Sequence, residues 1–302
     1  MIRVLTARLV THIRWGLLHR KMPCGLRQAY TRDGYCIVPG FLDEKTLSRI
    51  KEELCSVTGE ARQMVQGNTA TQRILLDSAF LAPRPHLSHL ANDRKFGNLL
   101  SYAGAKAVAP LLYIQRIRNG YHEGGADPQK TMHSDTFHPT MKAWLFLTDV
   151  EDRHGPFTYV KGSHKLTLAR FRWEYRRSCT AGTLHDGYSE KGSFRANAED
   201  LNAMGLPSPE GITAKAGTLV IANTNGFHGR GQAENGEGRT EIWAYSRHNP
   251  FNPLPGFGLK AVGHLEHFFL KAYWRFKDKQ AKKRGVPSSW HLIDAQDMLD
   301  GK

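Results

Sequence analysis

Short apolar runs in the second half of the chain have the length and composition of β-strands. They are rich in valine, isoleucine, phenylalanine, tyrosine, tryptophan and threonine, and turn-forming residues bound them. The runs are LLYIQRIRN from 111, KAWLFLTDV at 142–150, GPFTYVKG at 155–162, GTLVIANT at 217–224 and RTEIWAYSRHN at 239–249. Strands and helices do not alternate among them, which disfavours a parallel α/β sheet. The pattern predicts a sandwich or jelly roll over residues 111–250.

Helical patterns flank this region and interrupt it once. Residues 1–23 form a basic, amphipathic segment, and residues 24–110 read as a mostly helical flank that includes one strand, YCIVPGF, and Asp43 as a helix N-cap. Residues 60–110 read as helical or irregular. The insert at 164–210 is too long for a plain loop, and we expect it to be functional. The whole chain is expected to form one mainly β domain with flanking helices.

The C-terminal pattern is that of a second amphipathic helix, over residues 262–284. Its apolar residues follow the i, i+3, i+4 spacing of one helix face, and lysine and arginine surround them. They are Leu265, Phe268, Phe269, Ala272, Tyr273 and Phe276.

Composition and targeting signals narrow the class of protein. The chain has 302 residues, of which 40% are hydrophobic and 23% are charged, so wholesale disorder is excluded. It has no apolar run of transmembrane length, and Arg8, His12 and Arg14 interrupt any signal-peptide core. Its four cysteines form no C-x-x-C pair, which favours reduced, buried or half-buried thiols. A cytoplasmic protein is expected.

The net charge of +14 points to an anionic partner. A positive field of this size attracts nucleic acid, an acidic membrane surface or a phosphorylated substrate. Basic residues are concentrated near both ends and in the run RFRWEYRR of the insert, which contains Arg176 and Arg177. We expect these two arginines to contribute to substrate binding.

The stretch TMHSDTFHP, at 131–139, contains the candidate chemistry. His133 and Asp135 are two residues apart, so on a strand their side chains would point the same way. His228 follows a later strand and supplies a third ligand. Two histidines and one carboxylate in this arrangement match the facial triad of non-haem Fe(II) oxygenases. His138, in the same stretch, is either close to the metal or substrate, or exposed to solvent.

Arg239, eleven residues after His228, is a candidate for binding a dicarboxylate through a bidentate pair. A surface arginine is the alternative for this residue.

The order of these motifs resembles the phytanoyl-CoA dioxygenase family over about residues 30–250. The likeness rests on H-x-D at 133–135, KAWLFLTDV, GPFTYVKGSHK and GTLVI…HGRGQAENGEGR. It implies a double-stranded β-helix, a form of jelly roll, that binds Fe(II) and uses 2-oxoglutarate and O₂. It further implies that His133, Asp135 and His228 bind iron, that Arg239 binds 2-oxoglutarate, and that Trp144 lies beside the cosubstrate. Arg230 stands where relatives often have serine, and a second cation there would favour an anionic ligand.

The resemblance predicts a hydroxylase. Asp135 argues against a halogenase, which replaces this carboxylate with a small residue. The leading substrate hypothesis is an anionic, lipid-linked molecule, specifically the Kdo (3-deoxy-D-manno-octulosonic acid) sugar of the lipopolysaccharide inner core. Another lipid, an acyl-CoA or a small metabolite is the alternative, and the loop between Asp135 and Trp144 is shorter than in the phytanoyl-CoA enzymes.

Other partners and functions are also considered. The basic ends predict peripheral contact with an acidic membrane, on its inner face. A non-catalytic metal-binding jelly roll and a nucleic-acid-binding protein remain alternatives, although no single-strand stacking motif is recognisable. The sequence does not fix the oligomeric state.

Overall fold

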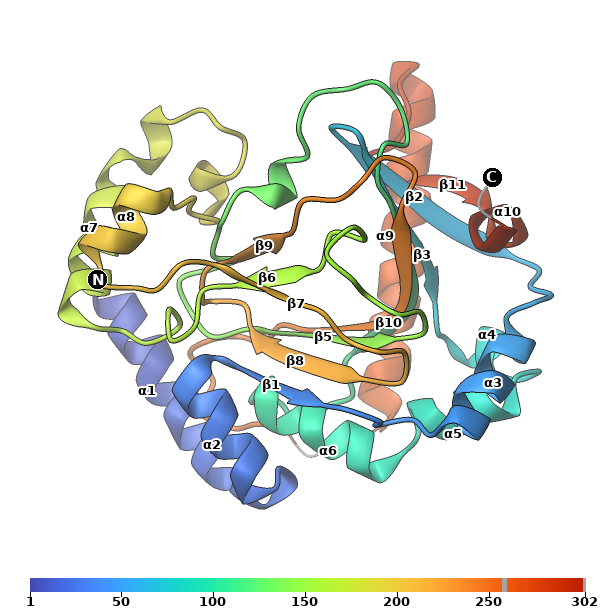
Figure 1. The fold of residues 1–302 in the computed structure, drawn as a ribbon, viewed down its shortest axis with the longest axis horizontal. Helices are drawn as coiled ribbons and strands as arrows, with labels where there is room; N and C mark the ends of the chain where they lie inside the picture. Colours follow the sequence, from blue (N-terminus) through green and yellow to red (C-terminus); the bar gives the residue numbers. More distant parts are fainter. Residues whose placement is uncertain (257–259, 301–302) are drawn as a thin grey trace.

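Two antiparallel sheets form the centre of the protein (Figure 1). The computed structural model describes residues 1–256 and 260–300. The larger sheet has the strand order β1 (Tyr35–Val38), β8 (Leu219–Asn223), β5 (Met141–Phe146), β10 (Gly238–Ser246), β4 (Leu111–Arg118), β3 (Thr69–Leu75), β2 (Glu60–Gln66) and β11 (His291–Asp294). The smaller sheet has the order β7 (Glu210–Ile212), β6 (Phe157–Tyr159) and β9 (His228–Arg230).

The two sheets pack through one apolar layer. Trp144, Phe146 and Val220 of the larger sheet meet Phe157 and Tyr159 of the smaller one in a single buried cluster. Every strand pairing is antiparallel among the described residues. Two packed sheets agree with the predicted sandwich or jelly roll, and strands form at all six predicted runs.

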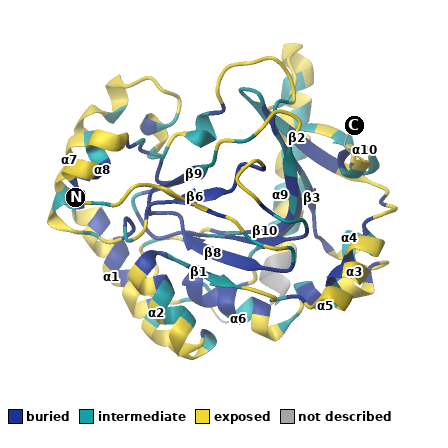
Figure 2. Cartoon of the chain, viewed as in Figure 1, coloured by how far each residue is buried: buried dark blue, intermediate teal, exposed yellow. Residues whose placement is uncertain are grey.

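Helices cover the other face of the larger sheet, so the label "mainly β" is too narrow. A second buried cluster joins sheet residues such as Ile114 and Ile221 to helix residues such as Tyr30, Ile50 and Leu99. Figure 2 shows these helices as exposed on the outside and buried toward the sheet. They are α1 (Ile2–Leu17), α2 (Cys24–Asp33), α3 (Glu44–Glu53), α4 (Ser78–Leu81), α5 (Pro85–Ala91) and α6 (Arg94–Ala103), with a 3-10 turn at His19–Lys21.

Local signals set the limits of several of these helices. Asp43 caps α3 as expected, because its carboxylate accepts the Thr46 N–H at 2.7 Å. Asp77 and Asp93 cap α4 and α6 in the same way.

The prediction for residues 60–75 was wrong, because this segment forms the hairpin β2–β3 rather than helix or irregular chain. Its strands lack the apolar alternation of a half-buried strand, because Thr71 and Arg73 line a cavity and the buried Gln72 donates a hydrogen bond to Gln63. The turn residues Gly67 and Asn68 were the available signal.

The insert at 164–210 is ordered, as expected of a segment that is not a plain loop. It contains α7 (Leu168–Thr180), α8 (Ala198–Ala203) and two short 3-10 turns, Ala181–Thr183 and Ser189–Lys191, between β6 and β7. A third apolar cluster, which includes Trp173, Phe194 and Phe227, fixes it to the smaller sheet.

The C-terminal region contains α9 (Lys260–Arg284), β11 and α10 (Ala295–Asp300). The predicted helix at 262–284 is confirmed, whereas β11 was not expected. None of the helices in the described ranges combines the length and apolarity that crossing a bilayer requires.

Cys36 is buried but Cys24, Cys55 and Cys179 are exposed, which corrects the expectation of buried or half-buried thiols.

Candidate metal centre

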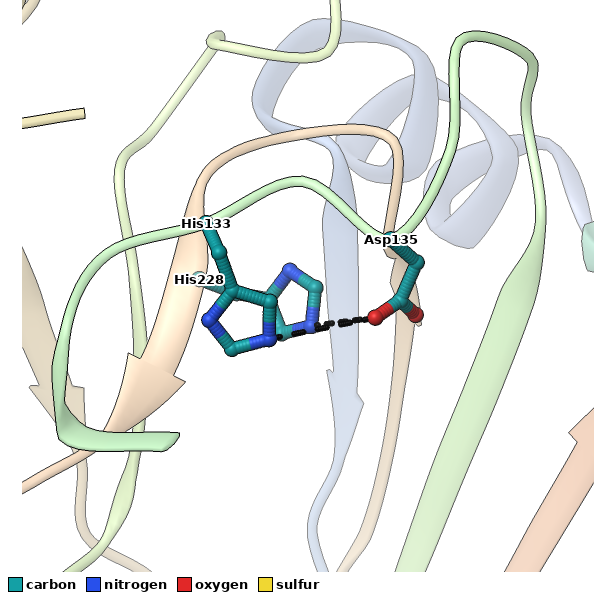
Figure 3. Close-up of side chains that lie close together, drawn as sticks. All are labelled: His133, Asp135 and His228. Carbon is teal, nitrogen blue, oxygen red and sulfur yellow. Dashed lines mark ion pairs between the residues drawn. The ribbon is translucent and has the colours of Figure 1, made fainter. Parts of the chain in front are cut away.

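Backbone pairing brings the three candidate ligands together at one end of the smaller sheet. His228 is the first residue of β9, and its N–H and C=O exchange hydrogen bonds of 2.9 Å each with the backbone of His133. The Asp135 N–H donates to the Thr224 carbonyl at 2.9 Å, which ties the segment to the end of β8. His133 and Asp135 lie in irregular chain before β5 rather than in a regular strand, yet their side chains converge as predicted (Figure 3).

The ligand atoms are spaced for one cation. Asp135 Oδ1 lies 3.8 Å from His133 Nε2 and 3.6 Å from His228 Nε2. One ligand atom from each of the three residues lies within 4.8 Å of the others. A metal at their centre would have two nitrogen ligands and one oxygen ligand.

Hydrogen bonds orient both imidazoles with Nε2 toward this centre. His133 Nδ1 contacts the Thr131 carbonyl at 2.8 Å, and His228 Nδ1 contacts the Gly226 carbonyl at 3.0 Å. A carbonyl partner requires Nδ1 to carry the proton, which leaves the lone pair on Nε2. His228 Nε2 is buried and makes no hydrogen bond within the described part of the chain. A divalent metal fits this donor set.

Burial and neighbouring charges set the protonation states. Burial, with the nearby His228 imidazole, holds the pKa of His133 well below its usual value, so the ring is neutral. Burial alone would raise the pKa of Asp135, but Lys142 and His228 outweigh it and hold that pKa well below its usual value. The centre therefore offers two imidazoles and a carboxylate, the set that binds Fe(II) in oxygenases.

A cavity of about 330 Å³ adjoins the three ligands and is strongly cationic. Asp135 supplies the only carboxylate among the described residues that line it. Six cationic side chains line the same space: Arg73, Lys142, Arg195, Arg230, Arg239 and Arg247.

The structure brings all three expected cosubstrate residues to this cavity. Buried Arg239 pairs through Nε with Glu241 at 2.9 Å and donates from Nη1 to the backbone carbonyls of His154 and Gly155. Arg230 pairs with Asp127 at 2.6 Å, and burial lowers its pKa to about 10. The Trp144 ring stacks on Phe157 with a centroid distance of 4.0 Å.

Three other predicted residues do not line the cavity. His138 is buried rather than exposed to solvent, its Nδ1 lies 3.1 Å from the Pro139 carbonyl, and burial lowers its pKa to about 4. Arg177 pairs with Asp200 at 2.7 Å on the insert. Arg176 is exposed on α7.

Sequence reasoning missed several of the residues that do line the cavity. Lys142 was detectable, because it lies two positions before Trp144 on β5 and therefore faces the same side. Arg73 was not predicted because β3 was not recognised as a strand. Arg195 was not predicted because it lies in irregular chain near the end of the insert. Tyr188 and Trp290 carried no local signal.

Comparison with known proteins identifies the family. A family model described as "Phytanoyl-CoA dioxygenase (PhyH)" matches residues 30–240. The chain belongs to the phytanoyl-CoA dioxygenase family. The expected resemblance is thus confirmed. As a member, the protein is a dioxygenase that uses iron, 2-oxoglutarate and O₂.

Curated relatives at lower identity cover most of the chain. An ectoine dioxygenase of Bordetella parapertussis is 25% identical over 256 residues, which are 77% of this chain and 78% of that protein. One of Stutzerimonas stutzeri is 26% identical over 227 residues, which are 68% of this chain and 70% of that protein.

Solved structures are also similar. The epimerase SnoN in complex with Fe³⁺, alpha ketoglutarate and nogalamycin RO has a TM-score of 0.47 and 20% identity, covering 76% of this chain and 83% of its own. HygX from Streptomyces hygroscopicus with nickel and 2-oxoglutarate has a TM-score of 0.45 and 18% identity, covering 74% and 86%.

Proposed function

We propose that His133, Asp135 and His228 bind Fe(II), and that Arg239 binds the distal carboxylate of 2-oxoglutarate in a hydroxylase of an anionic substrate. One observation carries this proposal: a two-histidine, one-carboxylate set converges at the wall of a cavity lined by six cations. The bound iron would supply the oxidative decarboxylation of 2-oxoglutarate and the oxidation of a substrate carbon.

The chain's own residues orient the reactants and exclude water. The backbone carbonyls of Thr131 and Gly226 keep both Nε2 atoms directed at the metal position. Glu241 and the His154 carbonyl hold the Arg239 guanidinium in place, so it can pair with a carboxylate without reorganising. The stacked rings of Trp144 and Phe157 form an apolar wall beside the centre.

The cation-lined cavity favours an anionic substrate. Both terminal nitrogens of Arg195 are buried and make no hydrogen bond within the described residues, and the guanidinium lies 4.2 Å from the Tyr188 ring centroid. Burying these donors without hydrogen-bond partners costs free energy. A carboxylate or phosphate that accepted hydrogen bonds from them would offset that cost. Arg73, stacked 3.8 Å from the Trp243 ring centroid, offers a second cation in the same cavity.

The leading specific substrate is the Kdo sugar on lipid A, because a carboxylated sugar suits this cavity and a lipid anchor suits a basic protein at an acidic membrane. A free small metabolite is the second candidate. It is favoured by the relatives named ectoine dioxygenase, since ectoine carries a carboxylate.

The test pairs Arg195→Leu with Arg176→Leu, which removes an exposed arginine outside the cavity. Purified enzyme with Fe(II) and 2-oxoglutarate is given Kdo-lipid A, ectoine or an acyl-CoA, and mass spectrometry records addition of one oxygen. We expect the enzyme to oxygenate an anionic substrate. The rate of oxygenation should fall at least tenfold in Arg195→Leu, because about one charge-assisted hydrogen bond to the substrate is lost. The rate should be unchanged in Arg176→Leu. An unchanged rate in Arg195→Leu would remove Arg195 from substrate binding. Oxygenation of neutral molecules alone would contradict the anionic substrate class.

A further inference from the structure

Helix α1 exposes a row of large apolar side chains on the surface of the protein. Its outward side carries large apolar side chains that are 46–82% exposed: Ile2, Leu5, Leu9, Ile13 and Leu17. Its inward side buries two arginines beside Val4, Ala7 and Val10. Arg8 donates to the His164 carbonyl at 2.8 Å, and Arg14 donates to the Asn252 carbonyl at 2.9 Å. Hydrogen bonds anchor this helix to the protein, while its apolar face is left in contact with water.

Helix α9 also exposes an apolar face. Its inward side forms ion pairs with the rest of the protein: Glu266 with Lys106 at 2.7 Å, Asp278 with Arg62 at 2.7 Å, and Lys271 with Asp77. Leu270 and Trp274 add apolar contacts on that side. The outward side carries side chains that are 54–66% exposed: Leu265, Phe268, Phe269, Tyr273 and Phe276. This is most of the apolar face that the sequence predicted.

A third segment, 249–256, is linked to both helices. Arg14 of α1 bonds to the Asn249 and Asn252 carbonyls, and Arg14 and Glu266 of α9 line one cavity of about 340 Å³ with this segment. Phe251 and Leu254 of the segment are themselves exposed. Both helices are drawn faint in Figure 1, on the far side of the molecule. Clusters of exposed large apolar side chains are typical of interaction sites.

We propose that this face, formed by the outward sides of α1 and α9 and by segment 249–256, docks on an anionic lipid bilayer. Exposed cations border the apolar stripe of α9: Arg275 lies next to Phe276, and Lys277, Lys279, Lys282 and Lys283 continue the helix beyond it. Aromatic and leucine side chains suit the boundary between headgroups and acyl chains, and the cations suit acidic headgroups. A second copy of this chain would oppose like charges, since each copy carries +14.

The docking face also touches the chain that holds the metal ligands. Phe137, two residues after Asp135, has its ring 6.5 Å from that of Phe251, and the guanidinium of Arg3 on α1 lies 4.8 Å from the Phe137 ring centroid. A bilayer bound to this face would therefore lie next to residues that contact Phe137, which is two residues from the candidate ligand Asp135. This inference does not depend on the proposed catalytic residues.

The experiment is co-sedimentation of the full-length enzyme with vesicles of phosphatidylcholine alone or mixed with phosphatidylglycerol. Phe269→Ser/Phe276→Ser removes two exposed aromatic side chains of α9, and Lys279→Gln/Lys283→Gln removes two of its cations. Leu168→Ser/Tyr175→Ser, on exposed positions of α7, is the matched control. Uncoupled succinate release by each variant is measured in parallel, so loss of docking is distinguished from loss of the fold or of the proposed chemistry.

We expect the wild type and the α7 control to pellet with the anionic vesicles, and less at high salt. The lysine variant should lose about fivefold in partitioning per charge removed, and the phenylalanine variant should stay in the supernatant with normal succinate release. No pelleting of active wild type would overturn the inference, as would equal pelleting with neutral vesicles. An α9-dependent dimer in light scattering would assign the face to a second copy instead.

Discussion

Lys142 Nζ lies 2.8 Å from Oδ2 and 3.0 Å from Oδ1 of Asp135, so a lysine occupies the far side of a candidate metal ligand. Both residues are about equally buried, with side chains 18% exposed. Without a metal ion, this ammonium group balances the negative charge of the Asp135 carboxylate. With a divalent cation bound, the same ammonium group repels the cation.

We therefore expect Lys142→Met to bind divalent metal about tenfold more tightly than the wild type, because one nearby positive charge is removed. Lys142→Arg keeps the charge and should keep the wild-type affinity. Anaerobic titration with Co(II), followed by its absorbance, measures both variants. Weaker binding in Lys142→Met would show instead that the lysine holds Asp135 in its ligating position.

Arg239 and Glu241 form a buried pair, so the choice of substitution at Arg239 matters. Arg239→Leu would leave Glu241 buried without its partner, which costs about 3–5 kcal/mol of stability. Arg239→Lys keeps the charge but loses the planar guanidinium that Glu241 and the His154 carbonyl hold in place. We expect it to raise the KM for 2-oxoglutarate about tenfold or more, with metal affinity unchanged.

Arg230→Lys is the matched control for this measurement, because Arg230 lines the same cavity and pairs with Asp127. Succinate release against 2-oxoglutarate concentration gives both KM values. A larger rise in Arg230→Lys than in Arg239→Lys would reassign the cosubstrate to Arg230.

Gly226 is packed too closely to accept a side chain. A Cβ at this position would lie 2.6 Å from Cζ of Tyr159 and 3.0 Å from Oγ of Ser163, and the Gly226 carbonyl also orients His228. We expect Gly226→Ala to lower the free energy of unfolding by about 1–3 kcal/mol and to weaken metal binding. Gly25→Ala, in open space on α2, should do neither. Urea unfolding measures the stability of both variants, and Co(II) titration measures their metal affinity. If Gly226→Ala were destabilised but bound metal normally, the close packing at Gly226 would not be needed to orient His228.

The sequence predicted best where side-chain burial follows a simple period. Strands such as β5 and β8 are buried and apolar along their length, so their runs were recognisable. The hairpin β2–β3 was not recognisable, because polar residues such as Thr71 and Arg73 line the cavity, and β-propensity does not identify a strand of this composition.

The candidate site was predictable only in part. The spacing of His133 and Asp135 is local, whereas His228 was proposed from its place after a later strand and from the facial-triad pattern, and the family likeness then supported it. Arg195 reaches the cavity because its backbone pairs with that of His133. This is a long-range contact, and the sequence pattern of the insert does not predict it. The orientation of α9 was equally hidden, since an amphipathic pattern does not say which face meets the protein.

The central claim is that His133, Asp135 and His228 together hold iron to which 2-oxoglutarate binds. The most direct measurement is the visible charge-transfer absorbance that develops when 2-oxoglutarate chelates Fe(II), recorded without oxygen for the wild type, for His228→Ala and for the surface control Arg176→Leu. The band should appear in the wild type and in Arg176→Leu and be absent in His228→Ala. A wild type that shows no band, or a band of full amplitude in His228→Ala, would contradict this assignment.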